Sequence, residues 1–328
     1  MSTVLPRVGL GVAIVAIAGV LATTVVGVSG ILAQGGAAAD NLFADTSLYV
    51  DPGSTAQAAA DAAAAAGDDA DAAAFGRIAR VPTAIWLTPE RHPLGEIGGY
   101  VSGLAEAAGK LGQAPVFTVY GVPDRDCGNQ SSGGLSAEQY PVWVQEIADA
   151  LSGSPAVIIL EPDALALAGE CGNVDARLGE IGGAVDSLAE AGLTVYIDAG
   201  HSNWGPAAEM ADLLNRAGVD RARGFATNVS NYNATDLEQA YAEQISAQTG
   251  GAHYVIDTSR NGNGSDGQWC NPPGRALGAE PSVSPSGSAQ DANLWVKPPG
   301  ESDGTCNGGP TAGEWWNAGA RELAANAH

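Results

Sequence analysis

The sequence predicts an α/β fold in which parallel strands form a closed or nearly closed barrel with helices outside it. From residue 83 onward, short β-branched or aromatic runs alternate with longer stretches of helical period. Such alternation places helices outside a parallel sheet, and seven strand candidates suit a barrel better than a two-layer hairpin fold. After the N-terminal segment about 290 residues remain, a length that one α/β barrel domain reaches without splitting.

The elements follow in a regular order. The strand candidates are Thr83–Leu87, Pro115–Tyr120, Ala156–Leu160, Thr194–Ile197, Gly224–Val229, His253–Asp257 and Leu294–Val296. Helices are predicted near 94–112, 137–152, 174–191, 206–217, 235–249 and 312–326. Capping pairs support two of the helix starts, Ser136 with Gln139 and Thr235 with Glu238. Upstream, the alanine run from Gln57 to Ala66 predicts a further helix on propensity alone.

The N-terminus has the pattern of an export signal. Residues 1–7 carry one arginine, residues 8–28 are apolar and uncharged, and three alanines precede Asp40. The apolar run is close to the ~20 residues of a spanning helix, so an uncleaved membrane anchor is the alternative. We therefore assign residues 1–40 to a signal peptide or anchor with a short linker, and residues 41–328 to a secreted catalytic domain.

The net charge indicates which class of binding partner is unsuitable, and the cysteines indicate disulfides. A net charge of −23 with only 14 basic residues excludes the phosphate contacts that drive nucleic-acid binding, so a neutral substrate fits better. The four cysteines lack CxxC spacing, and in an exported chain they predict two disulfides. Of the three pairings, the sequential one, Cys127–Cys171 with Cys270–Cys306, would tie loops on either side of a cleft.

Carboxylates gather where a barrel places its chemistry, at the carboxyl ends of the strands. Aspartates follow five of the predicted strands: Asp124 and Asp126, Asp163, Asp198, Asp257 and Asp303. Any one of them is explained by a solvated loop or a helix cap, but the series predicts an acidic cleft. Such a cleft either binds a hard cation or holds a proton on one carboxyl for acid catalysis.

Tryptophans favour acid catalysis on a sugar. Trp86, Trp204 and Trp269 lie at strand ends or in loops, where their faces suit the apolar face of a pyranose ring. The other tryptophans, in strand or helix patterns, are predicted to be core: Trp143, Trp295, Trp315 and Trp316. We expect neither a metal nor a cofactor.

Seven segments resemble glycoside hydrolase family 6, the cellobiohydrolases and endoglucanases with a distorted seven-stranded barrel. They occur in the family's order, from about residue 45 to the end of the chain. These segments are IWLTP (85–89), VYGVPDRDCG (119–128), ILEPDALAL (159–167), YIDAGHSNW (196–204), ATNVSNYN (226–233), QWCNPPGRALG (268–278) and LWVKPPGESDG (294–304).

The resemblance implies catalytic roles. Asp163 resembles the proton donor to the glycosidic oxygen, and Asp126 the neighbouring carboxylate that raises the donor's pKa. Asp303 is similar to the residue usually proposed as base, acting directly or through a chain of waters. Tyr120 resembles the tyrosine beside the distorted sugar. Arg125, beside Asp126, is expected to support the site structurally and to keep one carboxylate charged while Asp163 stays protonated.

It also implies binding roles. Lys297 and Glu301 resemble ligands of sugar hydroxyls, and Trp86, Trp204 and Trp269 resemble stacking platforms. Three further residues match the family's motifs but are equally explained as satisfied polar residues of loops. Of these, His201 and Asn231 fit binding, and Asp198 fits structural support of the site.

The function expected from this resemblance is an endo-β-1,4-glucanase that inverts the anomeric carbon, as carboxyls roughly 6.5–9.5 Å apart permit. The few residues between Asp303 and Ala312 leave little chain to roof a cleft, which favours internal cutting. The alternatives are an exo-acting cellobiohydrolase, a non-catalytic glycan-binding protein, and a metal-dependent lyase using Lys297 as a Schiff base. We expect a monomer whose partner is a β-1,4-glucan.

Overall fold

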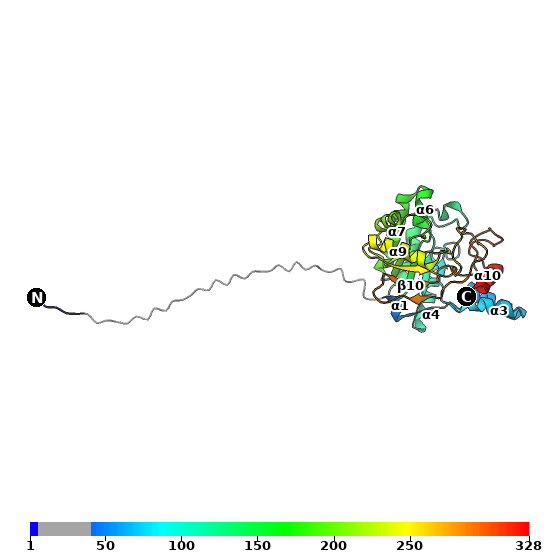
Figure 1. The fold of residues 1–328 in the computed structure, drawn as a ribbon, viewed down its shortest axis with the longest axis horizontal. Coiled ribbons are helices and arrows are strands. Elements are labelled where there is room, and N and C mark those ends of the chain that lie inside the picture. Colours follow the sequence, from blue (N-terminus) through cyan, green and yellow to red (C-terminus); the bar gives the residue numbers. More distant parts are fainter. Residues whose placement is uncertain (6–40, 328) are drawn as a thin grey trace. The chain divides into compact units, whose positions relative to one another are not determined.

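The computed structural model describes residues 1–5 and 41–327 (Figure 1). The segment predicted to be an export signal or membrane anchor lies outside these residues. None of the helices in the described part is long and apolar enough to cross a membrane.

The main sheet is parallel along almost its whole width, in the order β2-β4-β5-β6-β7-β8-β10-β9, and only the β9–β10 pair is antiparallel. Its strands are β2 (Ile85–Leu87), β4 (Val116–Val119), β5 (Val157–Leu160), β6 (Thr194–Asp198), β7 (Gly224–Thr227), β8 (His253–Asp257), β9 (Ser282–Val283) and β10 (Gln290–Leu294). A small parallel pair joins β1 (Ser47–Leu48) to β3 (Gln113–Ala114).

The sheet curls until its ends approach, but no ladder joins β2 to β10. Instead, the Ala84 N–H donates to the Trp295 carbonyl at 2.9 Å, and the Trp86 indole N–H donates to the Val296 carbonyl at 2.8 Å. The predicted distorted parallel α/β barrel is therefore confirmed, with its seam between the first and last parallel strands.

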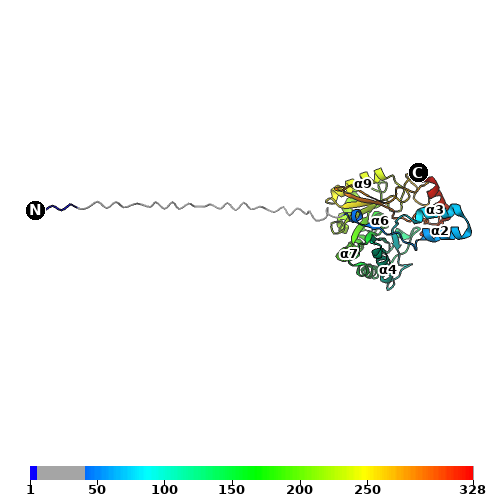
Figure 2. The same cartoon turned by 90° about the horizontal axis from the view of Figure 1, so that it is seen from below.

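Helices cover the outside of the sheet, and in Figures 1 and 2 α7 lies at the opposite end of the unit from α3. They are α1 (Leu42–Asp45), α2 (Thr55–Ala66), α3 (Asp69–Ala79), α4 (Ile97–Lys110), α5 (Tyr140–Leu151), α6 (Ala164–Cys171), α7 (Val174–Glu190), α8 (Ala207–Ala217), α9 (Thr235–Gln248) and α10 (Asn317–Asn326). A 3-10 turn, η1 (Asp126–Gly128), follows β4.

Strand β5 illustrates why the sheet is buried on both faces. Its four residues are all apolar and fully buried. Alternate side chains point to opposite faces, so Val157 and Ile159 enter the core inside the barrel, while Ile158 and Leu160 pack against the surrounding helices. Continuous apolar runs of this kind are typical of parallel strands covered on both sides.

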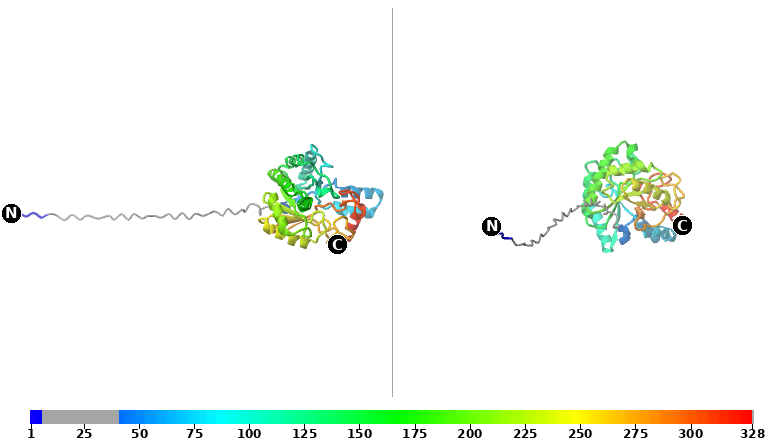
Figure 3. Two further views of the ribbon diagram at one scale, coloured as in Figure 1. Left: turned by 90° about the horizontal axis from the view of Figure 1, so that it is seen from above. Right: turned by 60° about the vertical axis from the view of Figure 1, so that its left-hand side comes forward.

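The N-terminal helices differ in part from the prediction. The alanine-rich helix is confirmed as α2, but α3 was not predicted, because its alanines and aspartates offer few large apolar residues. In Figure 3 the α2–α3 hairpin lies beside the C-terminal helix α10. Arg321 of α10 pairs there with Asp71, and Phe75 and Ile78 of α3 belong to a small separate core.

Three local predictions at helix starts and tryptophans are wrong. Thr235 and Glu238 form no capping pair, since the Thr235 hydroxyl accepts from Asn261 and the Glu238 carboxylate accepts from Ser202. The last helix begins at Asn317 rather than 312 because Trp316 has an extended backbone. Trp315 and Trp316, predicted to be core, are only partly buried.

The last parallel strand is shifted toward the N-terminus relative to the prediction, 290–294 instead of 294–296. The first residues of this strand are polar, so the sequence pattern did not indicate a strand there. Asp291 can be buried in the strand, with its side chain 2% exposed, because its carboxylate accepts hydrogen bonds from Tyr196 and Arg223. His253 Nδ1 lies 3.0 Å from the same carboxylate.

Candidate active site

The candidate acid Asp163 lies in the turn between β5 and α6. Its backbone is left-handed, with φ 69°, and Glu161 two residues earlier has φ 50°. Such a conformation is uncommon for side chains other than glycine and persists where neighbours hold it. Here the Asp163 N–H donates to Oδ2 of Asp198 at 2.9 Å, and the same oxygen accepts from Gly200 N–H.

The electrostatics of Asp163 fit a proton donor. Burial, together with the carboxylates of Asp126 and Asp303, raises its pKa to about 7, while Lys297 opposes the shift. No hydrogen bond reaches the Asp163 carboxyl from any other described residue. A carboxyl of this kind holds its proton near neutral pH and is free to give it to a substrate.

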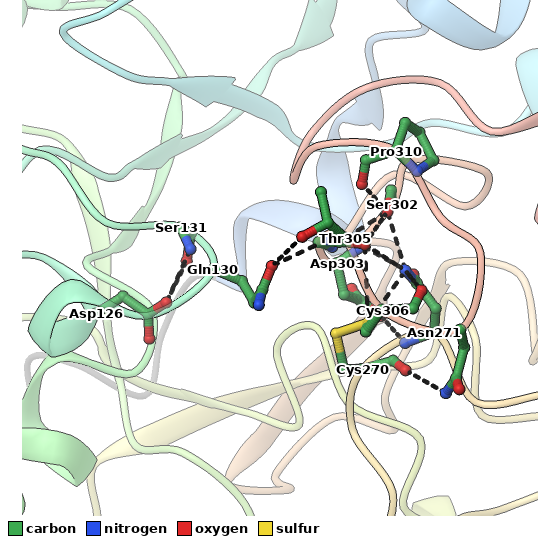
Figure 4. Close-up of a disulfide and its surroundings, with 12 residues drawn as sticks. Asp126, Gln130, Ser131, Cys270, Asn271, Ser302, Asp303, Thr305, Cys306 and Pro310 are labelled. Atoms are coloured by element: carbon green, nitrogen blue, oxygen red, sulfur yellow. Dashed lines mark hydrogen bonds between the residues drawn. A yellow bond between two sulfur atoms is a disulfide. The ribbon is translucent and has the colours of Figure 1, made fainter.

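Asp126 is fixed by the loop that follows it. Its Oδ2 accepts from both the backbone N–H and the hydroxyl of Ser131, each at 2.9 Å, as Figure 4 shows for Asp126 and Ser131. The Ser131 hydroxyl also lies 2.9 Å from the Tyr120 hydroxyl. Burial raises the Tyr120 pKa, and Asp163 adds to the shift, so this phenol is neutral and close to the candidate acid.

Arg125 contacts the loop that carries Asp126 and Ser131. Its guanidinium pairs with Glu90 at 3.1 Å and donates to the carbonyls of Tyr120 at 2.7 Å and Ser131 at 2.8 Å. It also lies 4.6 Å from the Tyr120 ring centroid. The carboxylate that Arg125 pairs with is therefore Glu90 and not the adjacent Asp126, which has a left-handed backbone and turns toward Ser131.

Asp303 is held in a buried polar cluster. Arg260 Nη1 donates to its Oδ1 at 2.9 Å and its Oδ2 at 3.1 Å. The Tyr232 hydroxyl and the Asn271 N–H donate to Oδ2 at 2.8 and 3.0 Å. Oδ1 keeps a lone pair free for a water molecule.

The loops carrying Asp126 and Asp303 touch each other. Figure 4 shows Gln130 beside Thr305. The backbone N–H and the hydroxyl of Thr305 donate to the side-chain oxygen Oε1 of Gln130 at 3.0 and 3.2 Å. The disulfide Cys270–Cys306 fastens the second loop to the segment that carries Asn271. The other disulfide joins Cys127 to Cys171, which gives the sequential pairing.

Trp86, Lys297 and Glu301, three of the predicted binding residues, lie close together and are called the binding wall below. Lys297 Nζ lies 5.5 Å from the Trp86 ring centroid, and the Tyr120 ring meets the Trp86 ring edge-on at 5.1 Å. Lys297 Nζ donates to the Ser302 carbonyl at 3.3 Å. Glu301 accepts from the Thr55 hydroxyl at 2.9 Å, and burial raises its pKa.

The remaining predicted binding residues are more dispersed. Trp204 lies 5.1 Å from the His201 ring, and burial lowers the His201 pKa to about 4, which leaves the imidazole neutral. Trp269 is 52% exposed, so its ring is accessible at the surface. Asn231 spends its side-chain oxygen on the next residue, accepting from Tyr232 N–H at 2.8 Å.

Two aspartates of the predicted series do not join the cluster. Asp124 is exposed. Asp257 is 1% exposed, and its carboxylate accepts backbone N–H bonds from Ser230, Ser259, Val296 and Lys297 at 2.9–3.2 Å, so it holds the scaffold together. Within residues 1–5 and 41–327, no group of three or more His, Cys, Asp or Glu side chains is arranged to hold a metal ion.

Sequence reasoning missed three residues of the site. Ser131 and Arg260 hold Asp126 and Asp303, and Glu161 accepts from the N–H groups of Gly121 and Val122, tying the β4 loop to the β5 turn. Burial raises the Glu161 pKa to about 7. Arg260 follows the end of β8 by three residues, a position that could have drawn attention to it.

The sequence is similar to curated glucanases. It is 47% identical over 283 residues to endoglucanase A of Cellulomonas fimi, covering 85% of this chain and 61% of that protein. It is 41% identical over 319 residues to endoglucanase A of Thermobispora bispora, covering 94% and 68%. The chain thus spans about three fifths to two thirds of the length of these relatives.

Solved structures of endoglucanases are also similar to this chain. The endoglucanase Cel6 of Mycobacterium tuberculosis, in complex with a methyl-cellobiosyl thio-cellobioside, superposes with a TM-score of 0.82 at 45% identity, over 88% of this chain and 99% of that one. Endoglucanase CEL6B of Humicola insolens gives a TM-score of 0.76 at 28% identity, over 88% and 99%. The sequence profile of glycosyl hydrolases family 6 matches residues 43–327, and the chain belongs to this family.

Proposed function

We propose that this chain is a secreted endo-β-1,4-glucanase that hydrolyses internal bonds of a cellulosic glucan with inversion, using Asp163 as the general acid. One observation carries the proposal: the Asp163 carboxyl has a raised pKa, faces two other carboxylates and has no protein hydrogen-bond partner among the described residues. The names of the family relatives support the substrate class and the endo action.

In the proposed reaction the protonated Asp163 gives its proton to the glycosidic oxygen as the bond to the anomeric carbon breaks. A water molecule attacks that carbon from the opposite face of the ring, which inverts its configuration. Asp303, held by Arg260, takes the proton of this water directly or through further waters. The negative charge of Asp126 disfavours ionisation of Asp163, so Asp163 keeps its proton until the substrate takes it.

The binding wall has a separate role. Trp86 offers an aromatic face to a pyranose ring, and Lys297 and Glu301 offer a donor and an acceptor to its hydroxyls. Secretion is supported by the two disulfides and by the apolar leader in residues 8–28. We assign residues 41–328, which follow this leader segment, to the catalytic domain.

An exo-acting cellobiohydrolase is the second candidate, favoured by one contact. The hydrogen bonds between Gln130 and Thr305 join two loops that carry proposed catalytic aspartates, and loops joined across a cleft would hinder entry of the middle of a chain. The short connection after Asp303 and the names of the bacterial relatives favour endo action instead.

The test measures viscosity and reducing ends together on carboxymethylcellulose. The wild type should lower viscosity early, with few reducing ends released, and Asp163→Ala should remove both signals. Asp124→Asn is the matched control, since this exposed loop aspartate should be dispensable. Slow viscosity loss with steady release of short sugars would favour the exo enzyme, and no release from any β-1,4-glucan would overturn the hydrolase.

A further inference from the structure

Glu161 is a buried carboxyl that the proposed reaction does not use. It is 1% exposed and lies two residues before Asp163, directly after β5. Its backbone is left-handed, with φ 50°, a conformation uncommon for glutamate that has to be held by neighbouring contacts. Burial raises its pKa to about 7, so the stability that it contributes is lost as pH rises through that value. Groups shifted in this way are frequent at functional sites.

The Glu161 side chain is bonded to the segment that follows β4. Its Oε1 accepts from the Gly121 N–H at 2.9 Å, and its Oε2 accepts from the N–H groups of Gly121 and Val122, both at 3.1 Å. The Glu161 N–H donates to the Val119 carbonyl at 2.9 Å, so the side chain continues the attachment of β5 to β4 beyond the backbone pairing. Two carboxylate oxygens can serve both N–H groups, whereas an amide has a single acceptor oxygen.

The segment held in this way carries Tyr120, which directly precedes Gly121. The Tyr120 hydroxyl lies 2.9 Å from the Ser131 hydroxyl, which donates to Asp126. The charge of Asp163 acts on the same phenol. Tyr120 therefore links the loop of Asp126 to the candidate acid, and its own backbone position depends on the N–H groups that Glu161 binds.

Glu161 is also part of the turn that carries the acid. Its carbonyl accepts from the Ala164 N–H at 3.2 Å, across Asp163. The Gly121 end of the connection has little freedom to move, because a Cβ added there would lie 2.9 Å from the Trp143 ring. The backbone of Glu161 thus belongs to the turn of the acid, and its carboxylate belongs to the neighbouring loop.

A general acid acts only when its oxygen reaches the atom that takes the proton, and a displacement of about 1 Å can cost ~10²-fold in rate. We propose that Glu161 is a positioning residue for proton donation, which holds the turn of Asp163 in register with Tyr120 and the loop of Asp126. Because it is buried, it acts through these contacts and not on the sugar. This inference rests on the proposed function.

The test compares two substrates that differ only in the leaving group, phenyl β-cellotrioside and its dinitrophenyl analogue, by release of the phenol. Dinitrophenolate leaves with little help from an acid, whereas phenolate needs the proton. Glu161→Ala should lower kcat for the phenyl substrate by about 100-fold. It should lower kcat for the dinitrophenyl substrate by less than about threefold, with KM nearly unchanged for both. Glu161→Gln keeps the size and one acceptor oxygen, so it should show a smaller loss of the same kind.

Asp257→Asn is the matched control. Asp257 is also 1% exposed and its carboxylate also accepts backbone N–H bonds at the end of a strand, β8, but its partners include Ser259 and Val296 and not the segment after β4. This variant should lower the melting temperature and change kcat for the two substrates by the same factor. Buried carboxylates that serve the fold alone behave in this way.

The outcomes separate the two proposals. If the Glu161 variants lower kcat for both substrates equally, or for neither, Glu161 serves the fold alone and the inference is overturned. A selective loss on the phenyl substrate in Asp163→Ala would then still support the acid. If Glu161→Ala does not fold, Glu161→Gln decides by the same comparison. If Asp163→Ala loses no more on the phenyl than on the dinitrophenyl substrate, Asp163 is not the acid, and the proposed function falls together with this inference.

Discussion

Arg260 and Asp303 form an ion pair whose side chains are only 3% and 6% exposed. The guanidinium contacts both carboxylate oxygens and also donates to the Ser230 carbonyl. In so dry a position the pair is stable because each charge is compensated by the other and by hydrogen bonds. The proposed base is therefore held in place by a residue that lies 43 positions earlier in the chain.

We expect Arg260→Ala to destabilise the protein by about 3–5 kcal/mol, the cost of leaving a buried charge without its partner. Activity should fall as well, since the Asp303 carboxylate would lose the guanidinium that positions it. Thermal unfolding and hydrolysis of carboxymethylcellulose measure the two effects. Arg216→Ala removes two exposed ion pairs, with Asp175 and Asp212, and should change little. An Arg260→Ala protein that melts with the wild type would contradict the argument.

Activity should depend on a carboxyl that stays protonated up to about pH 7. Because burial and two carboxylates raise the Asp163 pKa to about 7, the acid form is lost as pH rises through that value, and kcat/KM should fall with it. Asp163→Asn should lower the rate by at least ~10²–10⁴-fold, since amides do not act as acids here. A wild-type profile that stays flat from pH 5 to about pH 9 would argue against Asp163 as the acid.

The same shift should appear in stability. A carboxyl whose pKa is raised in the folded protein binds its proton more tightly when folded, so its contribution is fully present below the unfolded value of about 4. That contribution is lost as pH rises through about 7. Asparagine resembles the protonated acid at every pH. Asp163→Asn should therefore match the wild type near pH 4 and melt at higher temperature than it near pH 8.

The comparison needs a neutral reference site, and Asp124→Asn supplies one, because Asp124 is exposed in the neighbouring loop. Its melting temperature should follow that of the wild type across the same pH range. If the difference between Asp163→Asn and the wild type does not grow with pH, the carboxyl is ionised in the folded protein throughout.

The barrel could be predicted from sequence because its pattern is local. Most of the parallel strands are short apolar runs, such as Val157–Leu160, and most are followed by a helical stretch. Helix α3 could not be predicted in this way. Its few apolar residues, Phe75 and Ile78, are buried only because α10, about 250 residues later, folds back onto them.

In the candidate site, too, local features could be predicted and long-range contacts could not. The motif around Asp163 lies within one turn and could be recognised in the sequence. The partners of its neighbours are distant: Glu90 is 35 residues from Arg125, and Arg260 is 43 from Asp303. Neighbouring positions in the sequence can also have different contacts. Arg125 and Asp126 are neighbours in the chain, yet their side chains turn to different partners because the backbone changes to φ 57° at Asp126.

The tryptophans offer a final contrast between binding and stability. Trp269 is 52% exposed and Trp143 is fully buried, with its indole N–H bonded to the His92 carbonyl at 2.9 Å. Trp269→Ala should leave the melting temperature unchanged and raise KM for soluble glucan by about three- to tenfold, the worth of one stacked ring. Trp143→Ala should destabilise the protein by about 3–5 kcal/mol through the cavity it leaves. If Trp269→Ala lowered the melting temperature with KM unchanged, this ring would serve the fold and not the substrate.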